Sequence, residues 1–233
     1  TRELNDAAGW LGVADTALVS SLELLNRAKE LAVRAASTAT SDANARAAIA
    51  EELGNLRQEL IAIANTKYLG RSVFNGTADG DAYDASGTYL GNDAVIVRSV
   101  AAGTDVRINL TGEEIYGAQA GPDGDLFAVL DRLATAIVAG DSAAMAAEQG
   151  KLETARVRLA TATAELGSRA ARLDTIRARV ESDEVGLQET LSKIEDTDLA
   201  KALMDVKNRE NAYTAALTAA ARVIPQSLLD YLR

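Results

Sequence analysis

The sequence contains no cysteine and no histidine. Without cysteine, the chain can form no disulfide, no thiolate metal site and no cysteine nucleophile. Without histidine, it lacks the commonest general base at neutral pH and the commonest metal ligand in proteins. We therefore expect no metal, no cofactor and no catalytic residue, although carboxylates, lysines and tyrosines remain available for chemistry.

Positive charge is also scarce. The chain has 24 Lys and Arg against 34 Asp and Glu, a net charge of −10. Binding to a phosphate backbone needs a basic face, so we expect no nucleic-acid partner. We find no apolar run that approaches the length of a bilayer and no signal peptide, and we expect no membrane insertion. The chain begins at Thr1, inside a helical pattern, and we expect a fragment that lacks its native N-terminus.

An apolar repeat of seven residues dominates the C-terminal half. It comprises Met145, Leu152, Leu159, Leu166, Leu173, Val180, Leu187 and Ile194. Such a repeat marks a helix that lays one seam along partner helices. At about 1.5 Å per residue, a helix over residues 142–195 would be roughly 80 Å long, which predicts an elongated rod.

Two other long segments carry matching seams. In residues 4–36 an apolar residue recurs every seven positions, and in residues 42–65 the apolar residues alternate intervals of four and three. A shorter helix is expected after Asp125, ending at Gly140. We expect the three long seams to bury against one another in a coiled-coil-like bundle. The seam residues are Leu4, Leu11, Leu18, Leu25 and Ala32 in the first segment, and Ile49, Leu53, Leu56, Leu60 and Ile63 in the second.

The helical period is lost between residues 70 and 121, where much of the glycine lies. Two valine-rich runs, 95–100 and 106–110, predict two β-strands joined through Ala102-Gly103-Thr104. The fold class is therefore mainly α: an elongated rod of long helices with a small β-rich inserted domain. We divide the chain into residues 1–69 and 122–195 for the rod, 70–121 for the insert, and 196–233 for a terminal helix and tail.

The terminal helix has its own apolar stripe. The rod repeat stops at Lys201, and the change of phase falls at residues 195–198, which are rich in acid. No predicted helix is left to cover the new stripe, and an uncovered apolar helix face implies a partner. We therefore predict that the partner-binding residues are Leu199, Leu203, Val206, Tyr213 and Leu217.

Two other features have less specific interpretations. Residues 79–84 resemble a calcium loop, but Tyr83, Asp84 and Leu90 stand where the motif needs a ligand, Gly and Glu, so we interpret them as a solvated loop. The basic residues of the rod are expected to pair with neighbouring helices. They are Arg169, Arg172, Arg177 and Arg179.

Three stretches together resemble the flagellin superfamily. Residues 4–33, with Leu25-Asn26-Arg27-Ala28-Lys29-Glu30-Leu31-Ala32-Val33, resemble its first rod helix, and residues 194–217 resemble its C-terminal helix. Within residues 65–77, Leu69-Gly70-Arg71 is more similar to the hook–filament junction branch, that of hook-associated protein 3, than to the filament branch. The ending Leu228-Leu229-Asp230-Tyr231-Leu232 is also similar to the junction branch, whereas Val223-Ile224-Pro225-Gln226 resembles filament flagellin.

The resemblance implies a structural subunit that joins hook to filament in the bacterial flagellum. It implies type III export and an extracellular location. It also implies self-association in a ring, contact with an adjacent hook-associated protein and flagellin, and an export chaperone on the C-terminal helix.

Three alternatives stay open at this stage. The chain could be a filament flagellin with a reduced outer domain. The insert could be an adhesion module on the rod, although its aromatic residues are only Phe74, Tyr83, Tyr89 and Tyr116. An enzyme is the last alternative.

Overall fold

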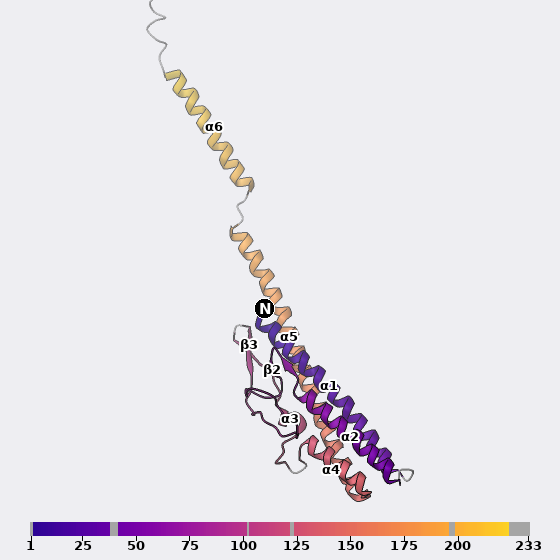
Figure 1. The fold of residues 1–233 in the computed structure, drawn as a ribbon. Coiled ribbons are helices and arrows are strands. Elements are labelled where there is room, and N and C mark those ends of the chain that lie inside the picture. Colours follow the sequence, from indigo (N-terminus) through magenta and orange to yellow (C-terminus); the bar gives the residue numbers. More distant parts are fainter. Residues whose placement is uncertain (1, 38–41, 102, 122–123, 196–198, 224–233) are drawn as a thin grey trace, which may run out of the picture. The chain divides into compact units, whose positions relative to one another are not determined.

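The computed structural model describes residues 2–37, 42–101, 103–121, 124–195 and 199–223. The predicted tail, Ile224 and the phase change at residues 196–198 lie outside this part of the chain. The described residues divide into two compact units, residues 1–180 and 181–233. The elements in Figure 1 are α1 (Arg2–Ala36), α2 (Ala43–Ala64), β1 (Lys67–Tyr68), β2 (Arg71–Ser72), β3 (Val97–Ala101), β4 (Thr104–Arg107), α3 (Gly112–Tyr116), α4 (Leu126–Ala139), α5 (Ser142–Glu195) and α6 (Leu199–Val223).

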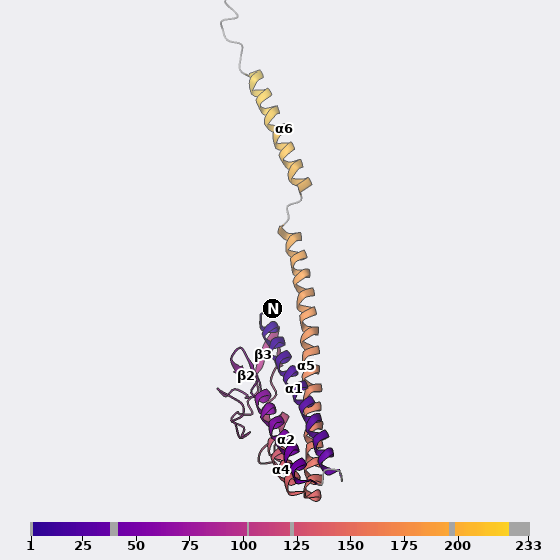
Figure 2. The same cartoon turned by 45° about the vertical axis from the view of Figure 1, so that its right-hand side comes forward.

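In the first unit, α1, α2, α4 and the first part of α5 lie side by side in both views (Figures 1 and 2). The predicted α1 seam is buried throughout, with no member more than 1% exposed. On α2 the predicted seam is buried except for Ile63, which is partly buried. The predicted helical bundle is confirmed, since these apolar stripes form one continuous core.

The α5 seam is buried only as far as residue 173. Met145 and Leu173 are 5% and 3% exposed, and the three seam leucines between them are also buried. Val180 is partly buried, whereas Leu187 and Ile194 are 70% and 76% exposed. The expectation that the whole seam packs within the bundle is therefore wrong beyond residue 180. The reason is length, since α1 has 35 residues and α5 has 54, or about 52 Å against about 81 Å of helix.

The helix ends use the capping residues that the sequence offers. Asp125 accepts a hydrogen bond from the backbone N–H of Ala128 at 2.7 Å, and Asp42 caps α2 in the same way. Gly140 ends α4 in the left-handed conformation at φ 70°. These caps fix where the bundle turns, and those at Asp125 and Gly140 lie where the sequence predicts them.

The insert contains both predicted strands. β3 and β4 pair antiparallel, in a shorter span than predicted, so Val95, Ile108 and Leu110 lie outside the ladder. A second hairpin, β1–β2, was not predicted. Its turn residues are Leu69 and Gly70, and this pair lacks the Asn-Gly or Asp-Gly signature of such turns.

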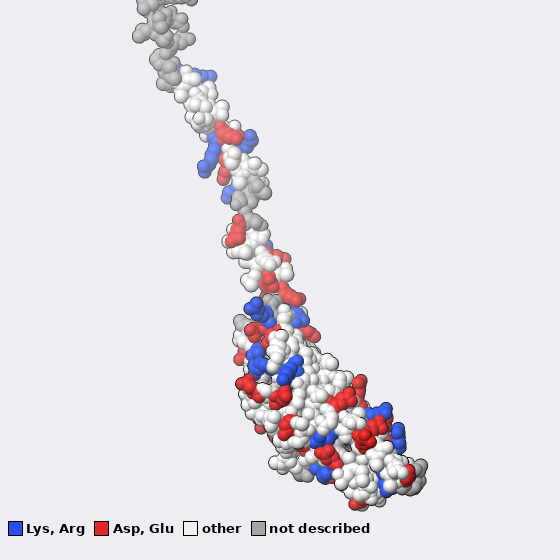
Figure 3. Space-filling model, in the orientation of Figure 1, with Lys and Arg blue, Asp and Glu red and all other residues white. Residues whose placement is uncertain are grey.

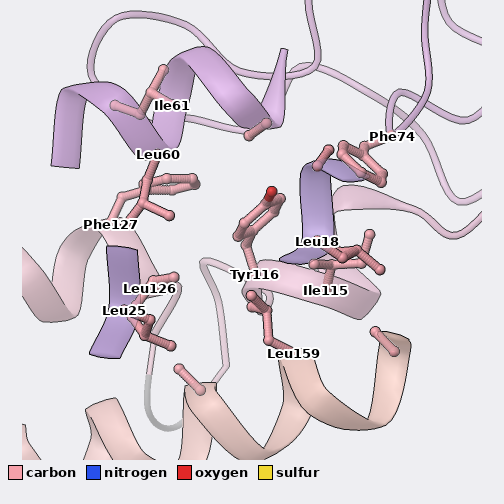
Figure 4. Packing of buried hydrophobic residues seen from close by; sticks show 14 of the residues in the cluster. Leu18, Leu25, Leu60, Ile61, Phe74, Ile115, Tyr116, Leu126, Phe127 and Leu159 are labelled. Atoms are coloured by element: carbon pink, nitrogen blue, oxygen red, sulfur yellow. The ribbon is translucent and has the colours of Figure 1, made fainter. Parts of the chain in front are cut away.

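Aromatic side chains from the insert lie inside the helical core. Phe74 and Tyr116 pack edge to face at 6.1 Å, near Leu18 and Leu159 of the helices (Figure 4). The Tyr116 hydroxyl lies 3.0 Å from that of Ser21 in α1. Tyr83 packs against Phe127 of α4 at 4.9 Å. The insert and the bundle therefore share one core, while the proposed boundaries at residues 69, 121 and 195 stay a prediction.

Arg57 connects three elements from a buried position. Its side chain on α2 donates to the backbone oxygens of Ser86 and Phe127, and it forms an ion pair with Asp131 at 3.0 Å. The residue is only 7% exposed. A buried guanidinium is stable when its donors have partners, and here those partners hold α2, the insert and α4 together.

The predicted pairing of the basic rod residues with neighbouring helices is found at Arg177, whereas Arg169 pairs with the insert and with its own helix. Arg177 donates to the Asn5 side chain of α1 at 3.0 Å. Arg169 donates to the backbone oxygen of Asn109 in the insert at 2.7 Å, and it also pairs with Glu165 on its own helix.

Among the described residues, one helix meets the length and composition of a membrane span, contrary to the sequence expectation. It is α1, whose most apolar window has a mean hydropathy of 1.2. The same residues supply the buried seam that contacts the other helices. Core helices of water-soluble bundles pass this test too, so α1 is explained by its packing in the first unit.

An ion-pair cluster joins α1 to α5. It predicts how the stability of the fold depends on pH. Arg156 and Lys29 lie 2.6 Å and 2.7 Å from the carboxylate oxygens of Glu153. Hydrogen bonds from Arg156, then from Lys29, lower the pKa of Glu153 to about 2. A lowered folded-state pKa stabilises the fold above the ordinary value of about 4.5, and this contribution is lost as pH falls towards 2.

We therefore expect that in Glu153→Gln the free energy of unfolding falls less steeply as the pH is lowered from about 4.5 to about 2. Urea denaturation at a series of pH values measures this slope. Glu59→Gln, at an exposed position of α2, is the control and should change the slope less. An unchanged slope in Glu153→Gln would contradict the role assigned to this cluster.

Candidate partner-binding helix

The predicted partner-binding residues lie on α6, in the second unit. Four of them are exposed, with Leu203 at 61%, Val206 at 50%, Tyr213 at 68% and Leu217 at 54%. The side chain of Leu199, the fifth, lies outside the described part of the chain. All four described side chains are therefore accessible to a partner.

Their spacing places these side chains on one face of the helix. Intervals of three, seven and four residues follow the a and d positions of a heptad, the pattern by which a helix packs on another helix. The stripe extends about 21 Å from residue 203 to residue 217. Glu210 occupies the a position inside it and forms an ion pair with Lys207 at 3.0 Å. A charge at such a position limits which partner helices can pack in register.

Sequence reasoning missed other exposed apolar side chains in the second unit. Met204 lies beside the stripe at 61% exposure. On residues 181–195 of α5 the exposed apolar side chains are Val185, Leu187, Leu191 and Ile194. The heptad repeat indicates which face of a helix is apolar but not how far a neighbour covers it. A comparison of the lengths of the predicted helices could have revealed the excess of α5.

The acidic loop and the buried tyrosines of the described chain have local structural explanations. No group of three carboxylate side chains is placed to hold a metal ion in the part that the structure describes. In the calcium-like loop, Asp84 accepts hydrogen bonds from Ser86 and Thr88 and closes a turn, and the Ser86 hydroxyl is the main cause of its lowered pKa. Burial raises the pKa of Tyr116, and it raises that of Tyr89 to about 12, so neither titrates near neutral pH.

The surface charge is mixed. On the face drawn in Figure 3, Lys and Arg alternate with Asp and Glu over the first unit. No broad basic area is visible on this face, so it offers no obvious site for a phosphate backbone. The candidate site is an exposed apolar helix face, and its role in protein–protein association stays a prediction.

Comparison with protein families shows to which family the chain belongs. Residues 1–79 match the bacterial flagellin N-terminal helical region, and residues 150–232 match the bacterial flagellin C-terminal helical region. Together the two matches cover well over half of the chain and leave out most of the insert. The chain belongs to the bacterial flagellin family. As a flagellin-family protein it is a structural component of the flagellum.

Solved structures of flagellar proteins share this fold. FlgL from Bacillus cereus has 22% identity and a TM-score of 0.69, covering 80% of this chain and 90% of its own. The flagellar junction protein FlgL from Legionella pneumophila has 13% identity and a TM-score of 0.66, covering 81% and 93%. Flagellin from Bacillus cereus has 26% identity but a TM-score of 0.54, covering 74% and 85%. No curated protein sequence matches the chain significantly.

Proposed function

We propose that this flagellin-family protein is the subunit that joins hook to filament. The observation that supports this most directly is the comparison within one organism. The fold is more similar to Bacillus cereus FlgL than to Bacillus cereus flagellin, by TM-scores of 0.69 and 0.54, although the flagellin has the higher identity. In this role the protein is not an enzyme.

Location on the flagellum tests this proposal. Isolated flagella from the producing cells would be labelled with gold-tagged antibodies raised against the insert, residues 70–121. A junction protein gives one narrow band where the filament begins. Label along the whole filament would instead establish the second candidate, a filament flagellin with a reduced outer domain. Flagella without any label would overturn both.

We also propose that α6 is the element that binds partners. Its exposed a/d stripe, Leu203, Val206, Tyr213 and Leu217 with Leu199 at its start, suits a helix that is covered in succession by different proteins. An export chaperone covers the stripe before type III export. Outside the cell, the stripe then packs in the axial assembly, where the subunits form a ring and contact the adjacent hook-associated protein and flagellin.

A charge on the stripe should abolish these contacts. Val206 is half exposed in the chain alone, and Val206→Asp would place a carboxylate in the apolar interface. We expect at least a 100-fold loss of affinity for the export chaperone, since burying an unpaired charge costs about 3 kcal/mol or more. Titration calorimetry with the purified chaperone measures this.

The matched control is Ala212→Asp, which adds the same charge to an exposed position of α6 outside the a/d face. It should bind within about threefold of the unmodified chain, because it changes helix propensity but not the interface. Equal losses in the two variants would refute a role for this particular face.

A further inference from the structure

The second unit carries two exposed apolar stripes, one at the end of α5 and one on α6. On α5 the stripe consists of Leu187, Leu191 and Ile194, and on α6 its described members are the partner-binding residues named above. Each of these side chains is at least half exposed. Because an exposed apolar face is costly in water, each stripe is expected to pack on another helix when one is available.

The two stripes have the same spacing when one of them is read backwards. From Ile194 towards Glu184 the intervals are three, four and three residues, and from Leu203 towards Tyr213 they are again three, four and three. Both follow the a and d positions of a heptad. Two antiparallel helices pack an a position of one against a d position of the other. The stripes therefore fit each other in this direction over about 15 Å.

This antiparallel register gives four layers of facing residues. They are Ile194 with Leu203, Leu191 with Val206, Leu187 with Glu210, and Glu184 with Tyr213. The first two layers are wholly apolar. In the third, Glu210 keeps its ion pair with Lys207 at 3.0 Å, and in the fourth the tyrosine hydroxyl can donate to the carboxylate of Glu184. Both carboxylates inside the stripes therefore have a partner.

Charge favours the pairing of unlike stripes. Residues 181–195 carry five carboxylates and one lysine, whereas α6 carries four basic side chains and two carboxylates. The complementarity belongs to the segments as wholes, because Lys207 already pairs within α6. Two α5 ends repel each other, and so do two α6 helices, whereas an α5 end attracts α6.

A second copy of the chain supplies a cover for both stripes. Because each chain has one stripe of each kind, two copies related by a two-fold axis form the α5–α6 contact twice. A parallel arrangement would instead align Glu184 with Leu203 and leave this carboxylate without a donor. It would also stagger the copies, so that a pair of them would leave one stripe of each kind uncovered.

We propose that two copies of the chain pair through the second unit, with the end of α5 in each copy antiparallel to α6 of the other. Copies in a ring are related by rotation about one axis and all point the same way, so this pair is not the proposed ring. The pair covers the stripe assigned above to partners, and it is therefore a resting form that the chaperone and the ring must displace. Only that consequence rests on the proposed function.

Disulfide trapping tests the register, because the chain has no cysteine of its own. The full chain would carry Leu191→Cys and Val206→Cys, which the pair sets opposite each other, and would be oxidised at concentrations where sedimentation detects dimers. We expect a covalently linked dimer. The control combines Leu191→Cys with Ala212→Cys, on α6 but outside its a/d face, and should give little linkage.

A second test uses the layer of Leu187 and Glu210. Leu187→Asp sets two carboxylates against each other, and it should weaken dimerisation about tenfold or more in sedimentation. Adding Glu210→Lys places opposite charges in that layer and should recover most of the loss, since among the two directions only the antiparallel one sets these positions together. Circular dichroism, at a dilution where the unmodified chain is monomeric, checks that both variants fold.

Four outcomes would overturn the proposal. A linked product of monomer size would mean that the stripes pair within one chain. Dimers with no more linkage than the control would mean that another surface carries the association. A chain that stays monomeric at every concentration would exclude the pair, and failure of Glu210→Lys to recover dimerisation would refute the antiparallel register. None of these results decides the junction function, which the gold-labelling experiment tests separately.

Discussion

Replacing Leu159 with aspartate is expected to unfold the first unit, residues 1–180. Leu159 on α5 is fully buried and lies next to Tyr116 in the shared core (Figure 4). The substitution removes a buried leucine, worth about 2–5 kcal/mol, and adds the cost of a buried carboxylate without a partner. That sum is comparable to the whole stability of a typical domain, about 5–15 kcal/mol. Circular dichroism during urea denaturation measures the loss.

The control for this prediction lies on the same helix and in the same heptad register. Leu187 is 70% exposed, so Leu187→Asp should leave the stability of the first unit within about 0.5 kcal/mol of the unmodified chain. A folded Leu159→Asp protein with unchanged stability would mean that this seam is not part of the core. A large loss in Leu187→Asp would mean that the second part of α5 is covered in solution.

The comparison of these two leucines shows how far the sequence determines the fold. A heptad repeat is local information, and it identified every buried seam residue of α1 and those of α5 up to Leu173. Coverage of a seam is not local, because it depends on where the partner helices end. The same repeat therefore predicted burial for Leu187 and Ile194, which are exposed in the structure.

The insert was harder to predict for a related reason. Its strands follow from runs of valine and isoleucine, but its packing depends on single aromatic side chains such as Phe74 and Tyr83, which have no periodic signal. Arg57 is a further case. A charged residue on a helix is normally solvated, and only the backbone oxygens of Ser86 and Phe127, distant in sequence, allow it to be buried.

The exposure of the α6 stripe could be predicted by elimination, whereas its binding of a partner stays a prediction. The stripe on α6 had no remaining helix to cover it, and the described members of the stripe are exposed in the structure. The identity of the proposed partner is not encoded in the stripe itself. Its a/d spacing specifies a helical partner, and Glu210 restricts the choice, but many helices satisfy both conditions.

The shared core leads to the second large prediction, for Phe74→Ala. Phe74 belongs to the insert, yet it is fully buried against Tyr116, whose hydroxyl contacts Ser21 of α1. Removing a buried phenylalanine side chain costs about 3–5 kcal/mol. Because the insert and the helices share that core, we expect the loss to destabilise α1 as well as the insert.

The single tryptophan makes this measurable, since Trp10 lies on α1 and is 3% exposed. Its fluorescence reports on the helix, and circular dichroism reports on the helices as a whole. In Phe74→Ala both urea transitions should move together to lower denaturant, whereas Leu90→Ala, at a residue 55% exposed, should move neither. If the Trp10 transition of Phe74→Ala stayed in place, the insert would fold independently, and the aromatic contacts with the bundle would contribute little to its stability.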